Sequence, residues 1–162
     1  MGTTWRLVKT RHKAAAFDGE GAKLSGGRWN SPGIPVVYTS DTPATSVLEM
    51  LVQDYPSRSL TEHWSFFTAT FPDALVEVIN PDTLPADWSN TPWPSALPAI
   101  GDQWIRERRS LVLVVPAAVL TLQRNFLINP LHPDRAKLII SAPQRFIFDA
   151  RILNKFAAGS KP

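Results

Sequence analysis

Fifteen prolines among 162 residues constrain the fold of this chain more than any other feature of its sequence. Each proline removes a backbone hydrogen-bond donor and restricts the conformation of the residue before it. Long helices are therefore mostly excluded, and we expect many short elements joined by turns. Hydrophobic residues make up 44% of the chain and charged residues 19%, so these elements can pack around a core. The length is typical of one domain.

Apolar patterns predict a mixed α/β (α+β) domain in which short strands outnumber a few short helices. The run at residues 111–115 is apolar throughout, which is typical of a strand buried on both faces. One helix should begin at Asp41 or Thr42, where either side chain can cap it, and end before Tyr55. A second helix should cover residues 99–109. The predicted strands are residues 3–9, 34–40, 64–71, 75–79, 111–115, 125–130, 137–141 and 145–149.

The segments between these elements are polar or rich in proline. Residues 11–24 should form a loop near a ligand, because functional residues concentrate in loops. Residues 81–98 should form an ordered but irregular excursion whose tryptophans cover the core. We expect a single compact domain over residues 1–155 and a flexible tail over residues 156–162.

Composition argues against several classes of site. The chain has no cysteine, and its three histidines are far apart in sequence, so we expect no metal site. The net charge of +3 comes from 17 basic and 14 acidic residues, and the dispersed basic residues argue against direct nucleic-acid binding. No segment is long and apolar enough to span a membrane, and the first residues do not resemble a signal peptide. A cytoplasmic location is therefore expected.

The stretch of residues 26–52 is where the sequence most strongly indicates chemistry. Two glycines directly before Arg28 let the backbone turn sharply and let a ligand approach closely. Tyr38 lies at the end of the apolar strand that follows, and Glu49 lies on the flank of the apolar stripe of the next helix. One β–α unit therefore carries a cation, an aromatic ring and an anion.

Each of these side chains also has a purely structural interpretation. The planar guanidinium of Arg28 suits phosphate oxygens, and Arg6 on the first strand is a second choice. Either arginine could instead form a surface salt bridge. Tyr38 could be an ordinary core residue with a hydrogen-bonded hydroxyl. Glu49 could be a solvated helix residue, which is the interpretation that the residues alone favour.

Four runs of residues, taken in order, resemble one family. Their order and spacing are similar to those of the RES-domain proteins, the toxins of RES–Xre toxin–antitoxin modules, and the resemblance extends from about Trp5 to about Phe148. It implies a fold similar to the catalytic domain of ADP-ribosyltransferases, with a cleft for NAD⁺ as the substrate and with no cofactor. The runs are Gly26-Gly27-Arg28-Trp29-Asn30, Val36-Val37-Tyr38-Thr39-Ser40, Leu48-Glu49-Met50-Leu51-Val52 and Asn125-Phe126-Leu127-Ile128-Asn129-Pro130-Leu131-His132-Pro133.

The resemblance also implies an activity and a partner. Toxins of this family deplete NAD⁺ by cleaving the nicotinamide–ribose bond through phosphorolysis or hydrolysis, and some members instead transfer ADP-ribose to a protein. A cognate Xre-type antitoxin blocks the active site. Whether the chain also forms a homo-oligomer stays open.

The family is named for an arginine, a glutamate and a serine, and this pattern implies roles for particular residues. Arg28 matches the arginine and Glu49 the glutamate, with Tyr38 as the third catalytic candidate. Ala117 stands where the serine is expected. A catalytically impaired module that binds NAD⁺ or the antitoxin is therefore an alternative to an active enzyme. The expected substrate contacts are Arg6, Arg28, Trp29, Tyr38, Ala117 and Asn129, although the position of Asn129 directly before Pro130 favours a role in ordering a turn.

Overall fold

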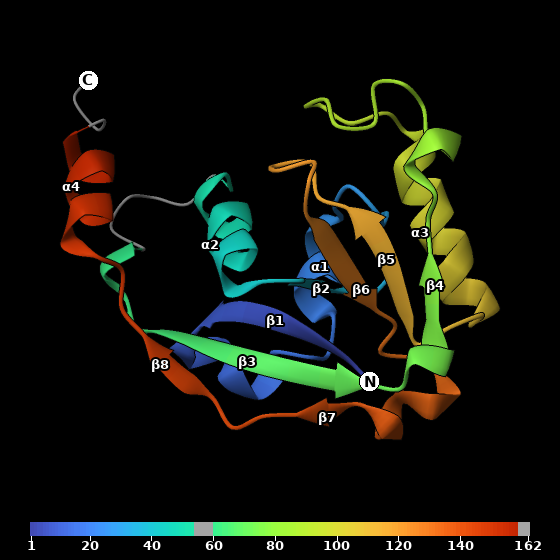
Figure 1. Cartoon of the computed structure of the whole chain (residues 1–162), viewed down its shortest axis with the longest axis horizontal. Helices are drawn as coiled ribbons and strands as arrows, with labels where there is room; N and C mark the ends of the chain where they lie inside the picture. Colours follow the sequence, from blue (N-terminus) through green and yellow to red (C-terminus); the bar gives the residue numbers. More distant parts are fainter. Residues whose placement is uncertain (54–59, 159–162) are drawn as a thin grey trace.

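The computed structural model describes residues 1–53 and 60–158. Within them, eight strands form one sheet in the order β4-β5-β6-β2-β1-β3-β7, and β8 also pairs with β3 (Figure 1). These pairings are antiparallel, apart from the parallel pairing of β4 with β5. The strands are β1 (Gly2–Lys9), β2 (Val37–Ser40), β3 (Trp64–Phe71), β4 (Val76–Val78), β5 (Val112–Pro116), β6 (Arg124–Ile128), β7 (Ile139–Ile140) and β8 (Gln144–Phe146).

Short helices connect the strands, and the longest described helix, α3, has 12 residues. The α-helices are α1 (Glu20–Ser25), α2 (Pro43–Leu51), α3 (Ala96–Glu107) and α4 (Ala150–Ala158). The 3₁₀ helices are η1 (Thr10–Ala15), η3 (Asp73–Leu75), η4 (Pro81–Thr83) and η5 (Pro133–Lys137). The predicted mixed α+β fold is confirmed, and each predicted strand overlaps an observed one.

One expectation about the connecting segments differs from the structure. The prediction of a loop at residues 11–24 is wrong, because η1 and α1 occupy most of that segment. Both helices have six residues and no buried side chain, so neither carries the apolar stripe that indicates a helix in sequence. The boundary expected at residue 155 falls inside α4. Residues 159–162 of the expected tail lie outside the described residues.

Cross-strand pairing assigns each side chain to one of the two faces of the sheet, because directly paired residues point to the same side. Trp5 pairs with Ser40, and Ser40 pairs with Asn125, so these three residues share one face. Helices α2 and α3 cover this face, which we call the helical face. Phe17, which follows η1, packs on the other face, which we call the η1 face.

Two separate core clusters lie on the helical face. Helix α2 packs over β1 and β3, where its Met50 joins the buried Trp64. Helix α3 packs over β5 and β6 through Leu97, Trp104 and Ile105. In strand order, β2 lies between the part of the sheet under α3 and the part under α2. The chain therefore passes from the cluster under α3 to the cluster under α2 where β2 is followed by α2.

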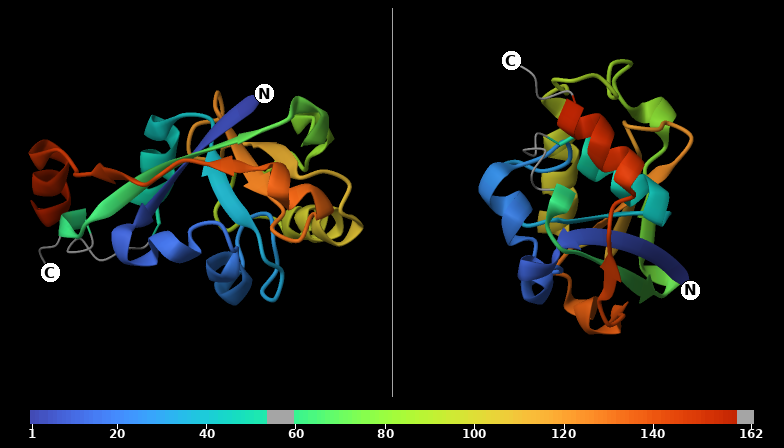
Figure 2. Two further views of the ribbon diagram at one scale, coloured as in Figure 1. Left: turned by 90° about the horizontal axis from the view of Figure 1, so that it is seen from below. Right: turned by 90° about the vertical axis from the view of Figure 1, so that its left-hand side faces the viewer.

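The sheet curls at the junction of β1 and β2. These strands share one paired position, Trp5 with Ser40, and Arg6 extends the connection because its Nη1 donates to the carbonyl of Tyr38. In Figure 1, β1 and β3 cross the view, whereas β5 and β6 run steeply. Helices α3 and α4 lie at opposite ends of the molecule in Figure 1 and in the left view of Figure 2.

Candidate active site

Strand β2 holds the loop that presents Arg28. The hydroxyl of Tyr38 accepts a hydrogen bond from the backbone amide of Trp29 at 3.0 Å and donates one to Oδ1 of Asn30 at 2.7 Å. A Cβ atom added to Gly27 would lie 2.7 Å from the same hydroxyl oxygen. Only glycine therefore lets the loop pass this close to the tyrosine.

Arg28 is half-buried beneath the irregular segment that follows η4. Its Nη1 donates to the carbonyl of Trp88 at 2.6 Å and to that of Asn90 at 2.9 Å. The guanidinium carbon lies 5.3 Å from the centre of a Trp93 ring. Among the described residues, the hydrogen bonds of this guanidinium all use Nη1, so Nη2 and Nε can still donate to an anionic ligand.

Helix α2 places Glu49 over the end of β2. The helix begins at Pro43, and the side chain of Thr42 caps it by accepting from the amide of Thr45 at 3.0 Å. The predicted capping pattern is thus confirmed. The Oγ of Ser46 donates to the carbonyl of Trp5 at 3.1 Å and ties the helix to β1.

Glu49 ends a chain of hydrogen bonds that starts on β2. Ser40 Oγ donates to Oδ1 of Asn125 at 2.9 Å, and Nδ2 of Asn125 donates to Oε1 of Glu49. Ser40 and Asn125 are buried, whereas Glu49 is partly exposed. Within the described part of the chain, Oε2 of Glu49 accepts no hydrogen bond. One carboxylate oxygen is therefore fixed, and the other can face a ligand.

Arg28, Tyr38 and Glu49 form one electrostatic group. Burial lowers the pKa of Arg28, and Glu49 and Tyr38 oppose that effect, so the guanidinium stays charged at neutral pH. Burial also raises the pKa of the Tyr38 hydroxyl well above its usual value. The Tyr38 hydroxyl already forms hydrogen bonds with Trp29 and Asn30, in the loop that contains Arg28. Tyr38 can therefore contact a ligand only through its ring.

Arg6 and Trp29, two of the predicted substrate contacts, do not line this group. Arg6 pairs with Phe67 on the η1 face, and its Nη1 supports the backbone of Tyr38. The Trp29 side chain is only 2% exposed and packs in the core under α3. It is held there because its carbonyl lies against Gly101, where an added Cβ would be 1.8 Å from the oxygen.

Asn129 also lies away from the group. It follows β6 at the opposite end of the strand from Asn125, about 13 Å away at a rise of roughly 3.3 Å per residue. Its side chain is buried, donates to the carbonyl of Ile105 at 3.2 Å and accepts from the amide of Leu131 at 2.9 Å. These bonds order the turn after β6, and they give Asn129 a structural role.

Ala117 extends the pairing of β5 with β6 beyond the end of β5. Its amide donates to the carbonyl of Gln123 at 3.1 Å. Val115 pairs with Asn125, and side chains two residues apart on a strand share a face, so Ala117 is on the same face as Asn125. The Ala117 side chain is fully buried. A serine hydroxyl at this position would lie on the helical face of the sheet.

Asn125 donates a hydrogen bond to Glu49 of this group, and the sequence assigned no role to it. It opens the last of the four family-like runs, so the sequence did contain a sign of its importance. Its contact with Glu49 depends on the pairing of β2 with β6, which local patterns do not reveal.

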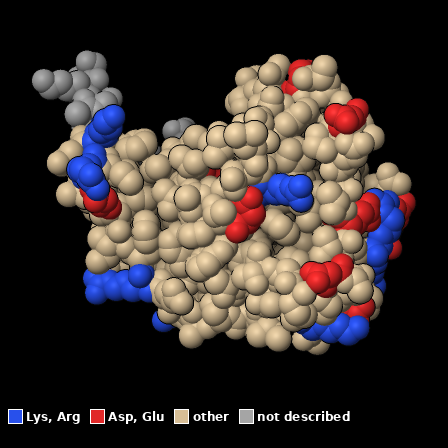
Figure 3. All heavy atoms as spheres, in the orientation of Figure 1, with Lys and Arg blue, Asp and Glu red and all other residues tan. Residues whose placement is uncertain are grey.

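The described residues contain neither a metal-binding cluster nor a membrane-spanning helix. Within residues 1–53 and 60–158, no three or more side chains of His, Asp or Glu are grouped so that they could hold a metal ion. In the same part of the chain, no helix has the length and apolar character needed to cross a bilayer. Charged side chains on the face shown in Figure 3 are scattered among uncharged ones.

Comparisons with known proteins agree on one family. The RES domain family matches residues 3–149. A protein of Photorhabdus laumondii subsp. laumondii named Toxin Res is 34% identical over 151 residues, covering 92% of this chain and 96% of the relative. A protein of Sphingobium sp. named Prs ADP-ribosylating toxin is 32% identical over 156 residues, covering 93% and 96%.

A solved structure shares the fold. The crystal structure of the M. tuberculosis MbcT-MbcA toxin–antitoxin complex contains a chain that matches with a TM-score of 0.74 and 19% identity, over 97% of this chain and 89% of that chain. The family match spans nearly the whole described fold, and both relatives align over almost their full length. This chain therefore belongs to the RES domain family.

Proposed function

We propose that this RES-domain protein is the toxin of a toxin–antitoxin module and an enzyme that cleaves the nicotinamide–ribose bond of NAD⁺ by phosphorolysis or hydrolysis. The names of its relatives and the fold shared with a chain of a toxin–antitoxin complex support the toxin assignment. The observation that best supports NAD⁺ cleavage is the hydrogen bond that Asn125 donates to Glu49. The Glu49 carboxylate held in this way also interacts electrostatically with Arg28. An action in the cytoplasm is part of the proposal.

Glu49 stabilises the charge that develops during cleavage. The bond from ribose C1′ to nicotinamide breaks with both electrons going to the nicotinamide nitrogen, so the leaving group departs neutral and needs little acid catalysis. The ribose then carries positive charge like an oxocarbenium ion. A carboxylate already oriented by Asn125 can stabilise that charge with little reorganisation. Its second oxygen, Oε2, is available to the ribose hydroxyls.

Arg28 binds the pyrophosphate of NAD⁺. A guanidinium can pair two N–H groups with phosphate oxygens, and Nη2 and Nε are the donors that remain for this purpose. The carbonyls of Trp88 and Asn90 hold the guanidinium from the other side, which fixes its position before substrate arrives. The ring of Tyr38 lies between the arginine loop and β2, where it can pack on the nicotinamide side.

Transfer of ADP-ribose to a protein is the second candidate function. It is favoured by the relative named Prs ADP-ribosylating toxin, which is 32% identical to this chain. The same bond of NAD⁺ breaks in both reactions, and they differ only in the oxygen or nitrogen atom that then bonds to C1′. In phosphorolysis or hydrolysis that atom belongs to phosphate or water, whereas in transfer it belongs to a protein side chain.

The products of the reaction distinguish these candidates. Purified, antitoxin-free protein is incubated with NAD⁺, with and without phosphate, and the products are separated by chromatography. Release of nicotinamide supports cleavage, and a dependence on phosphate distinguishes phosphorolysis from hydrolysis. Labelled NAD⁺ added to a cell lysate tests transfer, because only transfer produces a labelled protein band.

Ala117 defines a third outcome of the same experiment. Binding of NAD⁺ without turnover, measured by calorimetry, would indicate an impaired module. Recovery of turnover in Ala117→Ser would then attribute the impairment to the missing hydroxyl. Failure of both proteins to turn over NAD⁺ would contradict the proposed enzyme.

An Xre-type antitoxin is the partner included in the proposal. Its coexpression should relieve growth arrest, and it should copurify with this chain in a complex that no longer consumes NAD⁺. An antitoxin that relieves growth arrest without binding this chain would contradict that part of the proposal.

A further inference from the structure

A pocket lies on the η1 face, across the sheet from Glu49. Its volume is about 370 Å³, and typical small-molecule sites range over about 300–1,000 Å³. Phe67 pairs with Arg6, and Ile140 pairs with Ala69, which places both pocket residues on the η1 face. None of the residues assigned to NAD⁺ cleavage lines this pocket.

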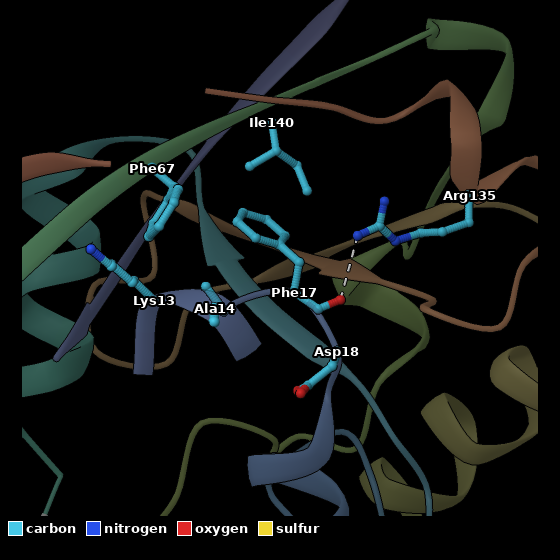
Figure 4. Close-up of a pocket in the computed structure, with 8 residues that line it drawn as sticks. Lys13, Ala14, Phe17, Asp18, Phe67, Arg135 and Ile140 are labelled. Carbon is cyan, nitrogen blue, oxygen red and sulfur yellow. Dashed lines mark hydrogen bonds between the residues drawn. The ribbon is translucent and has the colours of Figure 1, made fainter. Parts of the chain in front are cut away.

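Aromatic and branched side chains form the apolar wall of this pocket. Phe17 and Phe67 are 8% and 6% exposed, and their rings pack edge to face with centroids 5.8 Å apart. Ile140 on β7, the strand that pairs with β3, approaches the ring of Phe17 (Figure 4). Most of each ring is covered by the core, so an apolar group that enters the pocket contacts only the part of each ring that remains exposed.

Arg135 supplies a charge that its surroundings do not neutralise. Its guanidinium extends toward Phe17, and Nη2 donates to the Phe17 carbonyl at the long distance of 3.5 Å (Figure 4). Burial lowers the pKa of Arg135. Within the described residues, no carboxylate forms an ion pair with it, and the adjacent Asp134 pairs with Lys137 at 2.8 Å. A half-buried cation of this kind is stabilised by an anionic ligand.

The charges around the pocket indicate which anion fits. Besides Arg135, the charged lining residues are Lys13 and Asp18, so the lining carries two positive charges and one negative charge. Asp18 accepts from the amide of Glu20 at 2.9 Å, and in Figure 4 its side chain extends away from Arg135. The resulting excess of one positive charge suits a monoanion better than a phosphate dianion.

We propose that this pocket binds a small organic carboxylate with a flat apolar body. The ring of the ligand packs on Phe17 and Phe67, and its carboxylate accepts from the guanidinium of Arg135. The site is distinct from the NAD⁺ site, because the sheet separates Arg135 from Glu49. No covalent step is involved.

Titration of the full chain with benzoate tests the proposal. Benzyl alcohol supplies the same ring without the charge, and inorganic phosphate supplies charge without the ring. Nuclear magnetic resonance and calorimetry should show saturable binding of benzoate, with shifted resonances for Phe17 and Phe67, and weaker binding of both other probes. Arg135→Gln should weaken benzoate binding about tenfold or more, since a hydrogen bond to a charged group is lost.

Matched variants test whether a loss of benzoate affinity arises from the Arg135 pocket or from a general change in charge or folding. Arg135→Lys keeps the charge but loses the planar fork, so its loss of affinity should be intermediate. Arg151→Gln removes an exposed arginine that pairs with Asp149, and Glu49→Gln alters the NAD⁺ site, so neither should change benzoate binding. Thermal unfolding without ligand checks that each variant is folded.

Three results would overturn the proposal. They are equal binding of benzoate and benzyl alcohol, unchanged benzoate affinity in folded Arg135→Gln, and resonance shifts centred on Glu49 in place of Phe17. None of these measurements uses NAD⁺, so the outcome is independent of the proposed enzymatic function.

Discussion

Asn125 on β6 donates a hydrogen bond from Nδ2 to Oε1 of Glu49 on α2, although 76 positions separate them in sequence. Ser40 on β2 donates to the other end of the same amide. The chain of bonds begins in the buried part of the sheet and ends at a partly exposed carboxylate. The sheet thereby fixes the anion that we assign to the ribose cation.

Removing the members of this chain one at a time should reduce turnover in graded steps. Asn125→Ala should lower kcat for NAD⁺ by about 10- to 100-fold with little change in KM, because a hydrogen bond to a charged group is worth about 1.5–3 kcal/mol. Ser40→Ala should have a smaller effect, because it acts only through Asn125. Steady-state kinetics of both variants checks the order. A larger loss in Ser40→Ala than in Asn125→Ala would contradict the arrangement.

Arg28→Lys should weaken substrate binding more than it slows the reaction. Lysine keeps the charge but cannot pair with two phosphate oxygens or hold the two backbone carbonyls at once. We expect KM for NAD⁺ to rise by about tenfold, which corresponds to about 1.4 kcal/mol. Arg106→Lys is the control, because that side chain is exposed and 3.9 Å from its partner Asp102. A fall in kcat at constant KM would argue against the pyrophosphate role of Arg28.

Tyr38→Phe should destabilise the fold, because the Trp29 backbone amide and Oδ1 of Asn30 both lose their hydrogen bond with the Tyr38 hydroxyl. The expected loss is about 1–3 kcal/mol of unfolding free energy. The loss should also depend on pH. Burial raises the pKa of Tyr38 in the folded state, whereas an unfolded tyrosine titrates near about 10, so the wild-type advantage is complete below that pH and shrinks as the pH rises above it.

Urea unfolding of wild type and Tyr38→Phe at neutral and alkaline pH measures this difference. The lysines titrate in both proteins, so their contribution cancels when the unfolding free energy of Tyr38→Phe is subtracted from that of wild type. A stability difference that grows above pH 10, or that is absent at neutral pH, would contradict the assigned role of the hydroxyl.

Two glycines provide a matched pair for the packing of Trp29. Gly101→Ala should destabilise the protein by about 3 kcal/mol or more, because the new Cβ would lie 1.8 Å from the carbonyl oxygen of Trp29. Gly21→Ala meets no atom within 4 Å and should be neutral or stabilise α1 by up to about 1 kcal/mol. Thermal unfolding of the two variants measures this difference in stability. Equal melting temperatures would show that the loop can move away from α3.

The sequence predicted the parts of the fold and the site that depend on local patterns. Alternating and continuous apolar runs indicated every strand in the described part of the chain, because the period of a strand is visible within a few residues. Arg28, Tyr38 and Glu49 came together because they belong to one β–α unit. The capping of α2 was likewise visible at Thr42 and Pro43.

The remaining features depend on contacts between distant segments. The role of Asn125 follows from the pairing of β2 with β6, and the placement of Arg6 follows from its pairing with β3. Trp29 was predicted to contact substrate as part of the family-like run around Arg28, but its burial depends on contact with α3, far along the chain. Asn129 was included among the substrate contacts on family resemblance, but its position before Pro130 favoured a role in a turn, and its amide does order that turn.

The proposed function is tested most directly by NAD⁺ turnover of purified wild-type protein, Glu49→Gln and Glu20→Gln, with release of nicotinamide as the readout. Glu20 is exposed and pairs with Lys23, so its substitution controls for the loss of a glutamate elsewhere. We predict that Glu20→Gln keeps wild-type activity and that Glu49→Gln loses about 100- to 1,000-fold in kcat, as expected when electrostatic stabilisation of a transition state is removed. Equal turnover by Glu49→Gln and wild type would contradict the catalytic role proposed for Glu49.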